Sequence, residues 1–377
     1  MRVAIVTETY PPEINGVALT VASLASGLRH HGHEVQLIRP RQPQMPNAAE
    51  ADNEVLVRGV RLPRYPGLRI GLPARRRLHH LWKHTLPDAL YVATEGPLGH
   101  SALGVAGSLG IPACTGFHTR FDEFVRYYGF GFLTPIVLRY LRRFHRRSAA
   151  TLVPTVELAD FLREQGFGNV ELLRRAVDTR LFAPERRDPE LRVRWDLAPE
   201  QLAVIHVGRL AAEKNLKLAV RAFRSIQAHR PDARFILVGD GPTGATLQAQ
   251  NPDFVFCGMQ HGEALARHYA SGDLFLFPSV TETFGNVTLE ALASGVPVVA
   301  YDYGAAREHL CDACGRRVAF GNDDAFVQAA CELATQTDAG RKSMRQAARR
   351  AVDRLDPQTV CSSFAGLLAG LAKRGAA

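Results

Sequence analysis

The chain has 377 residues, of which 46% are hydrophobic and 22% are charged, and its formal net charge is +9. This length exceeds one ordinary hydrophobic core and suits two domains of roughly 150–200 residues each. The composition is that of a soluble globular protein, without the ~18 consecutive apolar residues that a transmembrane helix needs. The apolar run at the N-terminus is too short for a signal peptide, and Thr7 and Glu8 interrupt it, so we expect a cytoplasmic protein.

The positive charge is placed unevenly along the chain. Residues 1–180 carry 23 Lys and Arg against 15 Asp and Glu, whereas the remaining 197 residues carry 23 against 22. A one-sided basic field attracts nucleic acid, anionic membrane or acidic small molecules. The choice among these classes has to come from the motifs.

The first half of the chain alternates between predicted strands and helices. Residues 2–7 form a short run rich in Val and Ile, which is typical of a buried strand. From Val17 to His31 apolar residues recur at helical spacing, and Gly32 ends that helix before a strand at 34–40. This is a βαβ unit, and similar alternation continues through DALYVAT, IPACTGF and ATLVPT.

The same pattern restarts near residue 201, with strands predicted in QLAVIHVG, RFILVGDGP, FVFCG, DLFLFPS and PVVAYDY. Two runs of βα units predict an α/β fold with two doubly wound domains. We place these at residues 1–181 and 182–356, with a linker around 178–200 and a last helix at 357–377 that crosses back to the first domain. Ligands bind outside the carboxyl ends of such strands, so we expect the site in the cleft between the domains.

Two carboxylates stand eight residues apart in the segment PSVTETFGNVTLEALASGVPVVA, residues 278–300. Glu282 lies in the loop after a predicted strand, and Glu290 lies about one turn inside the helix that Gly295 closes. The unpaired N–H groups at the start of this helix suit a phosphate, and Gly285 allows close approach. The carboxylates would then accept hydrogen bonds from hydroxyl groups on either side of the phosphate.

Two other interpretations of this segment stay open. In the first, Glu282 caps the helix and Glu290 is a solvated surface residue. In the second, the two carboxylates are the acid and the nucleophile of a glycosidase, although a loop–helix pair fits that geometry poorly.

A second loop between a predicted strand and a helix is VGRLAAEKN, residues 207–215. Arg209 and Lys214 bring two positive charges to the strand end, as a departing nucleoside diphosphate requires. The alternative is a pair of solvated basic residues, which is common in loops.

Two further candidates lie in the first half of the chain. Asn15-Gly16 is a turn signal before a helix, and Gly16 would let main-chain N–H groups reach a phosphate. His118 follows a predicted strand, where it would orient a hydroxyl or share charge near a reacting sugar. Glycine is common in any tight βα turn, and a lone histidine is often structural, so both also have a purely structural interpretation.

Two basic segments suit docking onto anionic lipid. One is a predicted helix whose arginines share a face beside apolar residues, namely Arg139, Arg142, Arg143 and Arg146 beside Leu138, Leu141 and Phe144. The other is the segment 73–84, which contains Trp82. A solvated face of a core helix explains the same pattern. The chain has no RNP-like, helix-turn-helix or zinc-finger pattern, so we expect no nucleic-acid partner.

The six cysteines are scattered, and only Cys311 and Cys314 form a C-x-x-C. No second pair and no histidine cluster completes a metal-ligand pattern. We therefore interpret them as ordinary reduced cysteines in a loop and expect no metal site.

Taken together, these residues resemble the retaining GT-B glycosyltransferases of family 4, whose signature Glu-x7-Glu matches Glu282 to Glu290 in ETFGNVTLE. GRLAAEKN is similar to the family's donor-phosphate loop, and PPEINGVA to its N-terminal glycine loop. FHTRFDEFVRYYG is similar to the histidine segment of its α-mannosyltransferase and glycolipid-synthase branch. AVDTRLFAP resembles the segment entering the linker, with Ala176 in place of the usual Gly. The resemblance spans nearly the whole chain and implies an acceptor-binding N-terminal domain facing a donor-binding C-terminal one.

The resemblance also implies roles for the candidate residues. Glu290 holds the nucleotide ribose, His118 lies beside the donor sugar and the acceptor, and Gly16 closes over the diphosphate. The catalytic group is His118, Arg209, Lys214 and Glu282, where the two cations neutralise the leaving diphosphate. The donor nucleotide sugar is bound by Gly16, Arg209, Lys214, Glu282, Phe284, Gly285, Asn286, Val287 and Glu290.

The predicted activity is therefore that of a retaining, metal-independent α-hexosyltransferase without a cofactor. Its donor is of the GDP-mannose or UDP-glucose type, and its acceptor is a lipid or lipid-linked glycan. Departing phosphate oxygen takes the acceptor's proton on the same face of the sugar. The basic N-terminal segments predict peripheral contact with anionic membrane at the inner face of the cell membrane. The alternatives are another GT-B enzyme, such as a nucleotide-sugar epimerase or phosphorylase, and a non-catalytic nucleotide-sugar binder.

Overall fold

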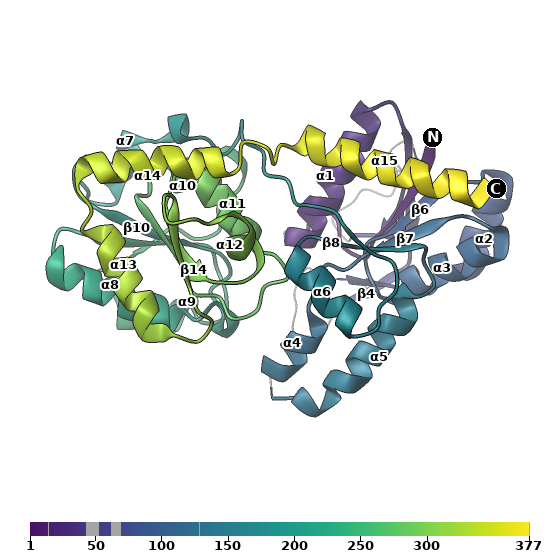
Figure 1. The fold of residues 1–377 in the computed structure, drawn as a ribbon, viewed down its shortest axis with the longest axis horizontal. Coiled ribbons are helices and arrows are strands. Elements are labelled where there is room, and N and C mark those ends of the chain that lie inside the picture. Colours follow the sequence, from purple (N-terminus) through teal and green to yellow (C-terminus); the bar gives the residue numbers. More distant parts are fainter. Residues whose placement is uncertain (14, 43–52, 62–68, 128, 377) are drawn as a thin grey trace. The chain divides into compact units, whose positions relative to one another are not determined.

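The computed structural model describes residues 1–13, 15–42, 53–61, 69–127 and 129–376. The chain divides into two compact units: residues 1–175 with 357–377 form unit 1, and residues 176–356 form unit 2. Each unit is an α/β domain built on a parallel sheet, which confirms the predicted fold class (Figure 1). The last helix, α15 (Pro357–Ala376), packs on α1 (Gly16–His30) within unit 1.

Unit 1 is built on seven parallel strands in the order β3-β2-β1-β6-β7-β8-β9. Their bounds are β1 (Arg2–Val6), β2 (Glu34–Pro40), β3 (Glu54–Val57), β6 (Ala89–Val92), β7 (Ala113–Gly116), β8 (Ala150–Val153) and β9 (Val170–Leu172). Strands β6, β7 and β8 are buried along their whole length, which explains their continuous apolar runs in the sequence. The short strands β3 and β9, and the antiparallel pair β4 (Gly59–Arg61) and β5 (Arg69–Gly71), are not predicted by the sequence pattern.

The other helices of unit 1 are α2 (Arg75–His84), α3 (Pro97–Leu109), α4 (Phe121–Tyr127), α5 (Thr134–His145), α6 (Val156–Glu164) and the 3-10 turn η1 (Gly131–Leu133). Helix α1 shows how the sequence produces them. The side chain of Asn15 caps it by accepting a hydrogen bond from the N–H of Ala18 at 2.9 Å. Val21, Leu24 and Leu28 then face the core, as their spacing predicts.

Unit 2 is built on six parallel strands in the order β12-β11-β10-β13-β14-β15. Their bounds are β10 (Ala203–Val207), β11 (Arg234–Val238), β12 (Val255–Phe256), β13 (Leu274–Phe277), β14 (Val298–Tyr301) and β15 (Gly315–Val318). The helices and 3-10 turns are η2 (Pro184–Arg186), α7 (Pro189–Arg194), η3 (Ala212–Lys214), α8 (Leu216–His229), α9 (Gly244–Gln250), α10 (Gly262–Ser271), α11 (Asn286–Ala293), α12 (Gly304–His309), α13 (Asp323–Ala334) and α14 (Asp338–Ala351).

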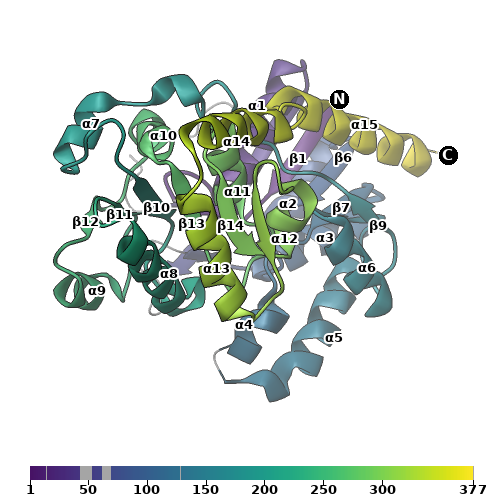
Figure 2. The same cartoon turned by 60° about the vertical axis from the view of Figure 1, so that its left-hand side comes forward.

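The sheet of unit 2 is buried on both faces, because alternate residues of one strand belong to two separate cores. Ile205 of β10 lies in a core with helices α10, α11 and α14, and its neighbour Val204 lies in a core with α8 and α13. Figure 2 shows these helices around the sheet. Alternation between two apolar surroundings explains why the strands carry few polar residues.

The strand order of unit 2 places β10 directly beside β13, although 66 residues separate their ends. Counted along the chain, the order is 3-2-1-4-5-6, so the connections leave β10 and β13 toward opposite sides of the sheet. This is the topological switch point, where α/β sheets of this kind bind ligands outside the strand ends. The corresponding neighbours in unit 1 are β1 and β6.

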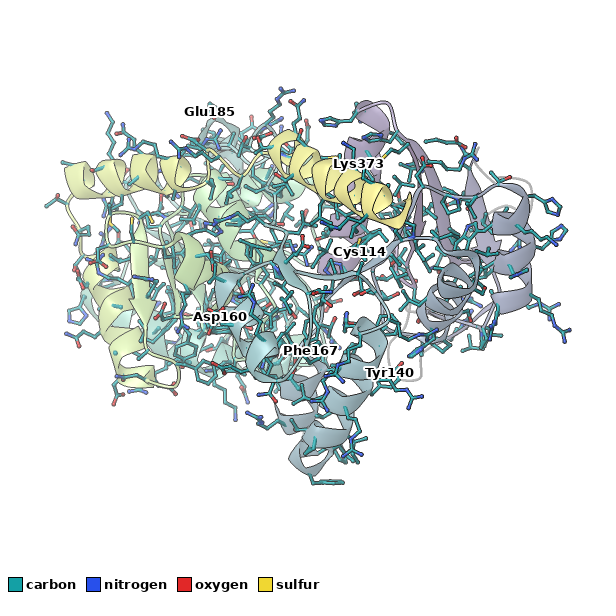
Figure 3. The ribbon with its side chains drawn as sticks, turned by 45° about the vertical axis from the view of Figure 1, so that its right-hand side comes forward. Cys114, Tyr140, Asp160, Phe167, Glu185 and Lys373 are labelled. Atoms are coloured by element: carbon teal, nitrogen blue, oxygen red, sulfur yellow. The ribbon has the colours of Figure 1, made fainter. Side chains whose placement is uncertain are left out.

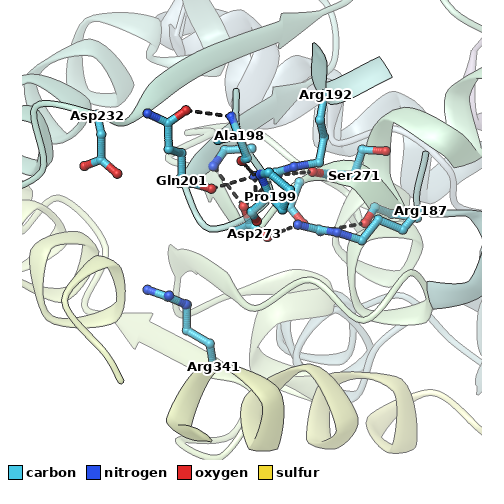
Figure 4. Close-up of polar contacts among 12 residues, drawn as sticks. Arg187, Arg192, Ala198, Pro199, Gln201, Asp232, Ser271, Asp273 and Arg341 are labelled. Atoms are coloured by element: carbon cyan, nitrogen blue, oxygen red, sulfur yellow. Dashed lines mark hydrogen bonds and ion pairs between the residues drawn. The ribbon is translucent and has the colours of Figure 1, made fainter. Parts of the chain in front are cut away.

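Residues 178–200, which we expected to form a linker, instead fold onto unit 2. Leu191 of α7 and Trp195, the C-cap of that helix, are buried in the core of unit 2. Arg192 donates to the carbonyl of Ser271 and to the carboxylate of Asp273, both at 2.9 Å (Figure 4). Two arginines of this segment, Arg187 and Arg192, are therefore paired with Asp273 of unit 2.

Candidate functional site

The predicted donor-binding residues of unit 2 lie in the two loops that leave the switch point. The loop after β10 carries Arg209 and Lys214, and the loop after β13 carries Glu282 and Gly285. Because β10 and β13 are hydrogen-bonded neighbours, these two loops start side by side at one edge of the sheet. The structure thus brings together residues that are about 70 positions apart in the chain.

Lys214 and Glu282 form a direct ion pair in which the ammonium group donates to the carboxylate. Both side chains are 17% exposed, so the pair is shielded from solvent but remains accessible. The hydroxyl of Ser279 donates to the same carboxylate at 2.8 Å, and Arg209 lies 3.7 Å from the carboxylate of Glu213. Ser279 and Glu213 are not among the predicted site residues. Their signal in the sequence is only their nearness to Glu282 and Lys214.

Helix α11 begins directly after the Glu282 loop. Its N-cap is Gly285, with φ +91°, and the carboxylate of Glu282 accepts hydrogen bonds from Lys214 and Ser279. The first N–H groups of a helix lack intrahelical acceptors and carry the positive end of the helix dipole. Gly295 has φ +70° and follows the last turn, as the sequence predicts.

The loop is held in place by helix α12, which the sequence does not reveal. The N–H of Ala305 donates to the carbonyl of Phe284 at 2.7 Å. The neighbouring Gly304 has φ +57°, and a β-carbon built on it would lie 2.6 Å from that same carbonyl oxygen. Only glycine allows the two backbones to approach this closely.

Glu290 is partly buried on α11, where the hydroxyl of Tyr269 donates to its carboxylate at 2.9 Å. Burial raises the pKa of Glu290 from 4.5 to about 7, and the hydrogen bond from Tyr269 partly offsets this. Glu290 is thus partly buried and hydrogen-bonded, which differs from a freely solvated surface residue. A raised pKa with a specific partner at a strand-end site is typical of functional carboxylates.

Replacing Glu290 by Gln is expected to remove a pH-dependent loss of stability. Between about pH 4.5 and 7 the folded chain keeps a proton that the unfolded chain releases, so the free energy of unfolding falls as pH rises through this window. E290Q does not titrate there, and its stability relative to wild type should rise by up to about 3 kcal/mol from pH 4.5 to pH 8. Thermal unfolding across this range measures the difference. The exposed Glu200→Gln variant should show no such trend, and a parallel pH dependence of E290Q and wild type would contradict the assignment.

In unit 1, Gly16 is the exposed first residue of α1, after the loop that leaves β1. Side chains on both sides hold this loop: Asn15 donates to the hydroxyl of Thr9 at 2.7 Å, and Thr9 donates to Glu13 at 2.5 Å. The carboxylate of Glu13 also accepts from Gln42. The strand-end position that the sequence predicts for Gly16 is thus present, and its loop is tied down by a polar network.

His118 follows β7 in unit 1, and both of its ring nitrogens are occupied. Arg175 lies 2.5 Å from Nδ1, and because a guanidinium only donates, Nδ1 is the acceptor. The neutral ring then carries its proton on Nε2, which donates to the hydroxyl of Tyr91 at 2.6 Å. Burial, followed by the charges of Arg175 and His145, lowers the pKa of His118 well below its usual range. Sequence reasoning does not reveal Tyr91 or Arg175, since each is remote in the chain.

The basic segments of unit 1 are arranged differently from the expected surface. Leu141 and Phe144 face the core, while Phe132 and Ile136 are 74% and 64% exposed beside the arginines of α5. Trp82 is fully buried, with its indole N–H donating to Gln36 at 2.9 Å. Figure 3 labels Tyr140 on α5. Among the described residues, no helix has the length and apolarity needed to cross a membrane.

The described part of the chain contains no cluster of three or more His, Cys, Asp or Glu side chains placed to hold a metal ion. The loop predicted around Cys311 and Cys314 is present between α12 and β15. It holds the two sulfur atoms 3.5 Å apart.

Comparisons with known proteins agree with this arrangement. A family model described as Glycosyltransferase Family 4 matches residues 14–181, and one described as Glycosyl transferases group 1 matches residues 201–336. A GDP-mannose-dependent alpha-mannosyltransferase of Mycolicibacterium smegmatis is 36% identical over 372 residues, which are 97% of this chain and 96% of that protein. The alpha-monoglucosyldiacylglycerol synthase of Streptococcus pneumoniae is 26% identical over 317 residues, covering 80% and 71%.

The fold has solved counterparts as well. The structure of Anabaena HepE in complex with UDP-glucose matches with a TM-score of 0.74 at 18% identity, over 98% of this chain and 100% of that one. Three observations support one family assignment. They are the Glu-x7-Glu segment, the cationic loop beside it and the two matching family models. The chain belongs to the family 4, group 1 glycosyltransferases with the GT-B fold.

Proposed function

We propose that this glycosyltransferase moves mannose from GDP-mannose to a hydroxyl group of a lipid or lipid-linked glycan, with retention of configuration. The observation that carries the proposal is the Lys214–Glu282 ion pair at the switch point of unit 2, beside the N-terminus of α11. The donor is chosen because the 36% identical relative is a GDP-mannose-dependent enzyme. The lipid acceptor rests on the diacylglycerol named for the streptococcal relative.

In this proposal unit 2 holds the donor. The N–H groups of Asn286 and Val287 at the start of α11 receive the diphosphate, as helix N-termini commonly do. Glu290 accepts hydrogen bonds from the ribose hydroxyls. Glu282, oriented by Ser279 and Lys214, accepts hydrogen bonds from the sugar.

The charge that develops when the glycosidic bond breaks is on the leaving diphosphate. Lys214 and Arg209 would stabilise it, because preorganised cations act most strongly where charge appears in the transition state. The departing phosphate oxygen takes the proton of the acceptor hydroxyl, so that no residue of the chain has to serve as base. Metal independence follows from this assignment and remains a prediction.

Unit 1 is proposed to bind the acceptor, with Gly16 and His118 at its strand ends. His118 is neutral and already donates to Tyr91, so we do not assign it proton transfer. It would contact a sugar only by exchanging its bond to Tyr91 or Arg175.

A calorimetric panel of GDP, UDP, GDP-mannose and UDP-glucose tests the donor. We expect the two guanosine ligands to bind at least about tenfold more tightly than their uridine counterparts, which corresponds to about 1.4 kcal/mol. Proton NMR of the product tests the reaction, with an α-linked mannosyl lipid expected. An altered free sugar nucleotide would instead indicate an epimerase, phosphate-dependent turnover would indicate a phosphorylase, and binding without turnover would indicate a non-catalytic binder.

Peripheral membrane docking is proposed through the exposed face of α5 and the turn before it. Arg139 and Arg143 lie beside the exposed Phe132 and Ile136, which combines basic charge with apolar surface. Each arginine near an anionic surface contributes about 1 kcal/mol. The double variant Arg139→Ala with Arg143→Ala should therefore bind phosphatidylglycerol vesicles ~30-fold more weakly in a sedimentation assay at low salt.

Two controls accompany this docking experiment. Arg221→Ala with Arg267→Ala removes the same charge from exposed positions of unit 2 and should leave vesicle binding nearly unchanged. Val193→Glu alters a side chain that is 73% exposed on α7, whereas Ile136→Glu alters the proposed face. Equal losses for both arginine pairs, or for both Glu variants, would show that binding depends on net charge and not on this face.

A further inference from the structure

Cys311 and Cys314 occupy one tight turn between α12 and β15. The N–H of Cys314 donates to the carbonyl of Cys311 at 2.9 Å, which closes a four-residue turn. Such a turn holds its first and last α-carbons within ~7 Å, and a disulfide needs about 4.4–6.8 Å. The sulfur atoms are 3.5 Å apart, and the N–H of Cys311 donates to the sulfur of Cys314 at 3.2 Å. Joining the two thiols shortens the distance between the sulfur atoms from 3.5 Å to about 2.05 Å, so the sulfur atoms have to move within the turn.

The two cysteines differ in a way that assigns them different chemical roles. Cys311 is exposed, so it can be attacked or can attack a small molecule, while Cys314 is fully buried. Burial raises the pKa of the Cys314 thiol to about 12. A thiol with a high pKa is a poor leaving group, so a disulfide that contains it is broken slowly. Arg316 donates to the carbonyl of Asp312 at 2.7 Å and holds the turn in place.

The turn is connected to the Glu282 loop through the six residues of α12. At one end, the sulfur of Cys314 lies 3.9 Å from the carbonyl of His309, and the ring of His309 packs edge-on against Phe284 with centroids 6.1 Å apart. At the other end, the N–H of Ala305 donates to the carbonyl of Phe284. Phe284 directly precedes the N-cap of α11. These contacts link the position of the Cys314 sulfur to the loop that carries Glu282.

We propose that Cys311 and Cys314 form a reversible disulfide that weakens donor binding by displacing α12 from the Phe284 loop. A low-molecular-weight disulfide such as oxidised glutathione is the oxidant. The Cys311 thiolate attacks one of its sulfur atoms and releases one thiolate. Cys314 then loses its proton to solvent and attacks the sulfur of Cys311, which releases the second. Two protein thiols are oxidised, and one small disulfide is reduced to two thiols.

Mass spectrometry of the full chain tests the bond itself. After exposure to oxidised glutathione, wild type should lose 2 Da, with the link between residues 311 and 314, and dithiothreitol should restore the mass. Cys311→Ser and Cys314→Ser should not form it, while Cys331→Ser, which alters a half-buried cysteine on α13, should form it normally. Persistent glutathione on Cys311 without the internal bond, or full retention of both thiols, would overturn the proposal.

Calorimetric binding of GDP tests the effect on the site, and this arm rests on the proposed function. Oxidised wild type should bind GDP about fivefold more weakly than reduced wild type, which is at the low end of coupling between sites. Cys314→Ser should bind GDP equally with and without the oxidant. Equal affinity of the two wild-type forms, once the disulfide has been verified by mass, would refute the coupling. If reduced protein fails to bind GDP, the proposed donor fails, and the mass measurement still decides whether the disulfide forms.

Discussion

The Lys214→Met variant is expected to turn over about 10²–10³ times more slowly than wild type, with kcat reduced more than donor affinity. Lys214 is held by Glu282 within the two loops of the switch point, so its charge is already in place when the bond breaks. A preorganised cation stabilises the leaving diphosphate without reorganisation, and methionine keeps the length of the side chain while removing the charge. Steady-state kinetics with GDP-mannose and a lipid acceptor measures kcat and KM separately.

A matched control and a double variant show whether the loss reflects catalysis. Lys217→Met makes the same substitution three residues later, at an exposed position of α8, and should leave kcat within about threefold of wild type. Lys214→Met also leaves the shielded carboxylate of Glu282 without its partner, so part of the loss can arise from that charge. Combining it with Glu282→Gln removes the charge, and kcat should remain low. Recovery of kcat in the double variant would show that Lys214 serves only to neutralise Glu282.

Gly304→Ala is expected to lower kcat/KM for the donor by more than about tenfold while the protein still folds. The added β-carbon would lie 2.6 Å from the carbonyl oxygen of Phe284, so the backbones must separate and the bond from Ala305 must lengthen. The left-handed φ of +57° adds a further cost of about 1–2 kcal/mol for a residue with a β-carbon. The separation displaces the loop that carries Glu282 and Gly285. Calorimetry with GDP and kinetics with GDP-mannose measure the effect.

The Gly321→Ala variant separates backbone strain from displacement of the loop. Gly321 has φ +80°, but a β-carbon there has no neighbour within 4 Å. Gly321→Ala should lower the unfolding temperature about as much as Gly304→Ala does, and it should leave donor affinity unchanged. If the two alanine variants lose donor affinity equally, the contact between α12 and the Phe284 loop does not position the site.

The sequence is sufficient to predict that the strands form two α/β domains. Parallel strands buried on both faces must be apolar at consecutive positions, and runs such as 203–207 and 274–277 meet this condition. Continuous apolar runs do not predict the short edge strands. Strand β3 begins with two partly buried residues, and β9 has an exposed end, so neither needs a continuous apolar run.

The sequence predicts only part of the candidate site. The loops after β10 and β13 follow from the strand ends and from their glycines and charges. That they start side by side depends on the strand order, and local sequence does not encode which strands become neighbours. The ion pair of Lys214 with Glu282 and the hydrogen bond of Tyr269 with Glu290 join residues 68 and 21 positions apart, respectively. Helix α12 contributes through the backbone hydrogen bond from Ala305 to Phe284, which the side chains of the helix do not predict.

Burial decided several features that residue type left open. The arginines of α5 were predicted from their spacing, but the apolar residues exposed beside them are Phe132 and Ile136. Leu141 and Phe144 fill the core because the helix turns that side toward the sheet. His118 is predicted to lie beside a sugar, and the structure shows that both of its ring nitrogens have partners within unit 1. Periodicity shows that a helix has two faces, and packing decides which face is buried.

The sequence by itself determined the fold class, the family and the two loops with their glycines, cations and carboxylates. These depend on local rules: the periodicity of apolar residues, the turns that glycine permits and the spacing of Glu282 and Glu290 around a helix N-terminus. The tertiary structure alone decided how these groups are paired, how their pKa values shift, and that Cys311 and Cys314 lie 3.5 Å apart. Contacts and burial depend on residues brought close by the whole fold, so no short stretch of sequence determines them.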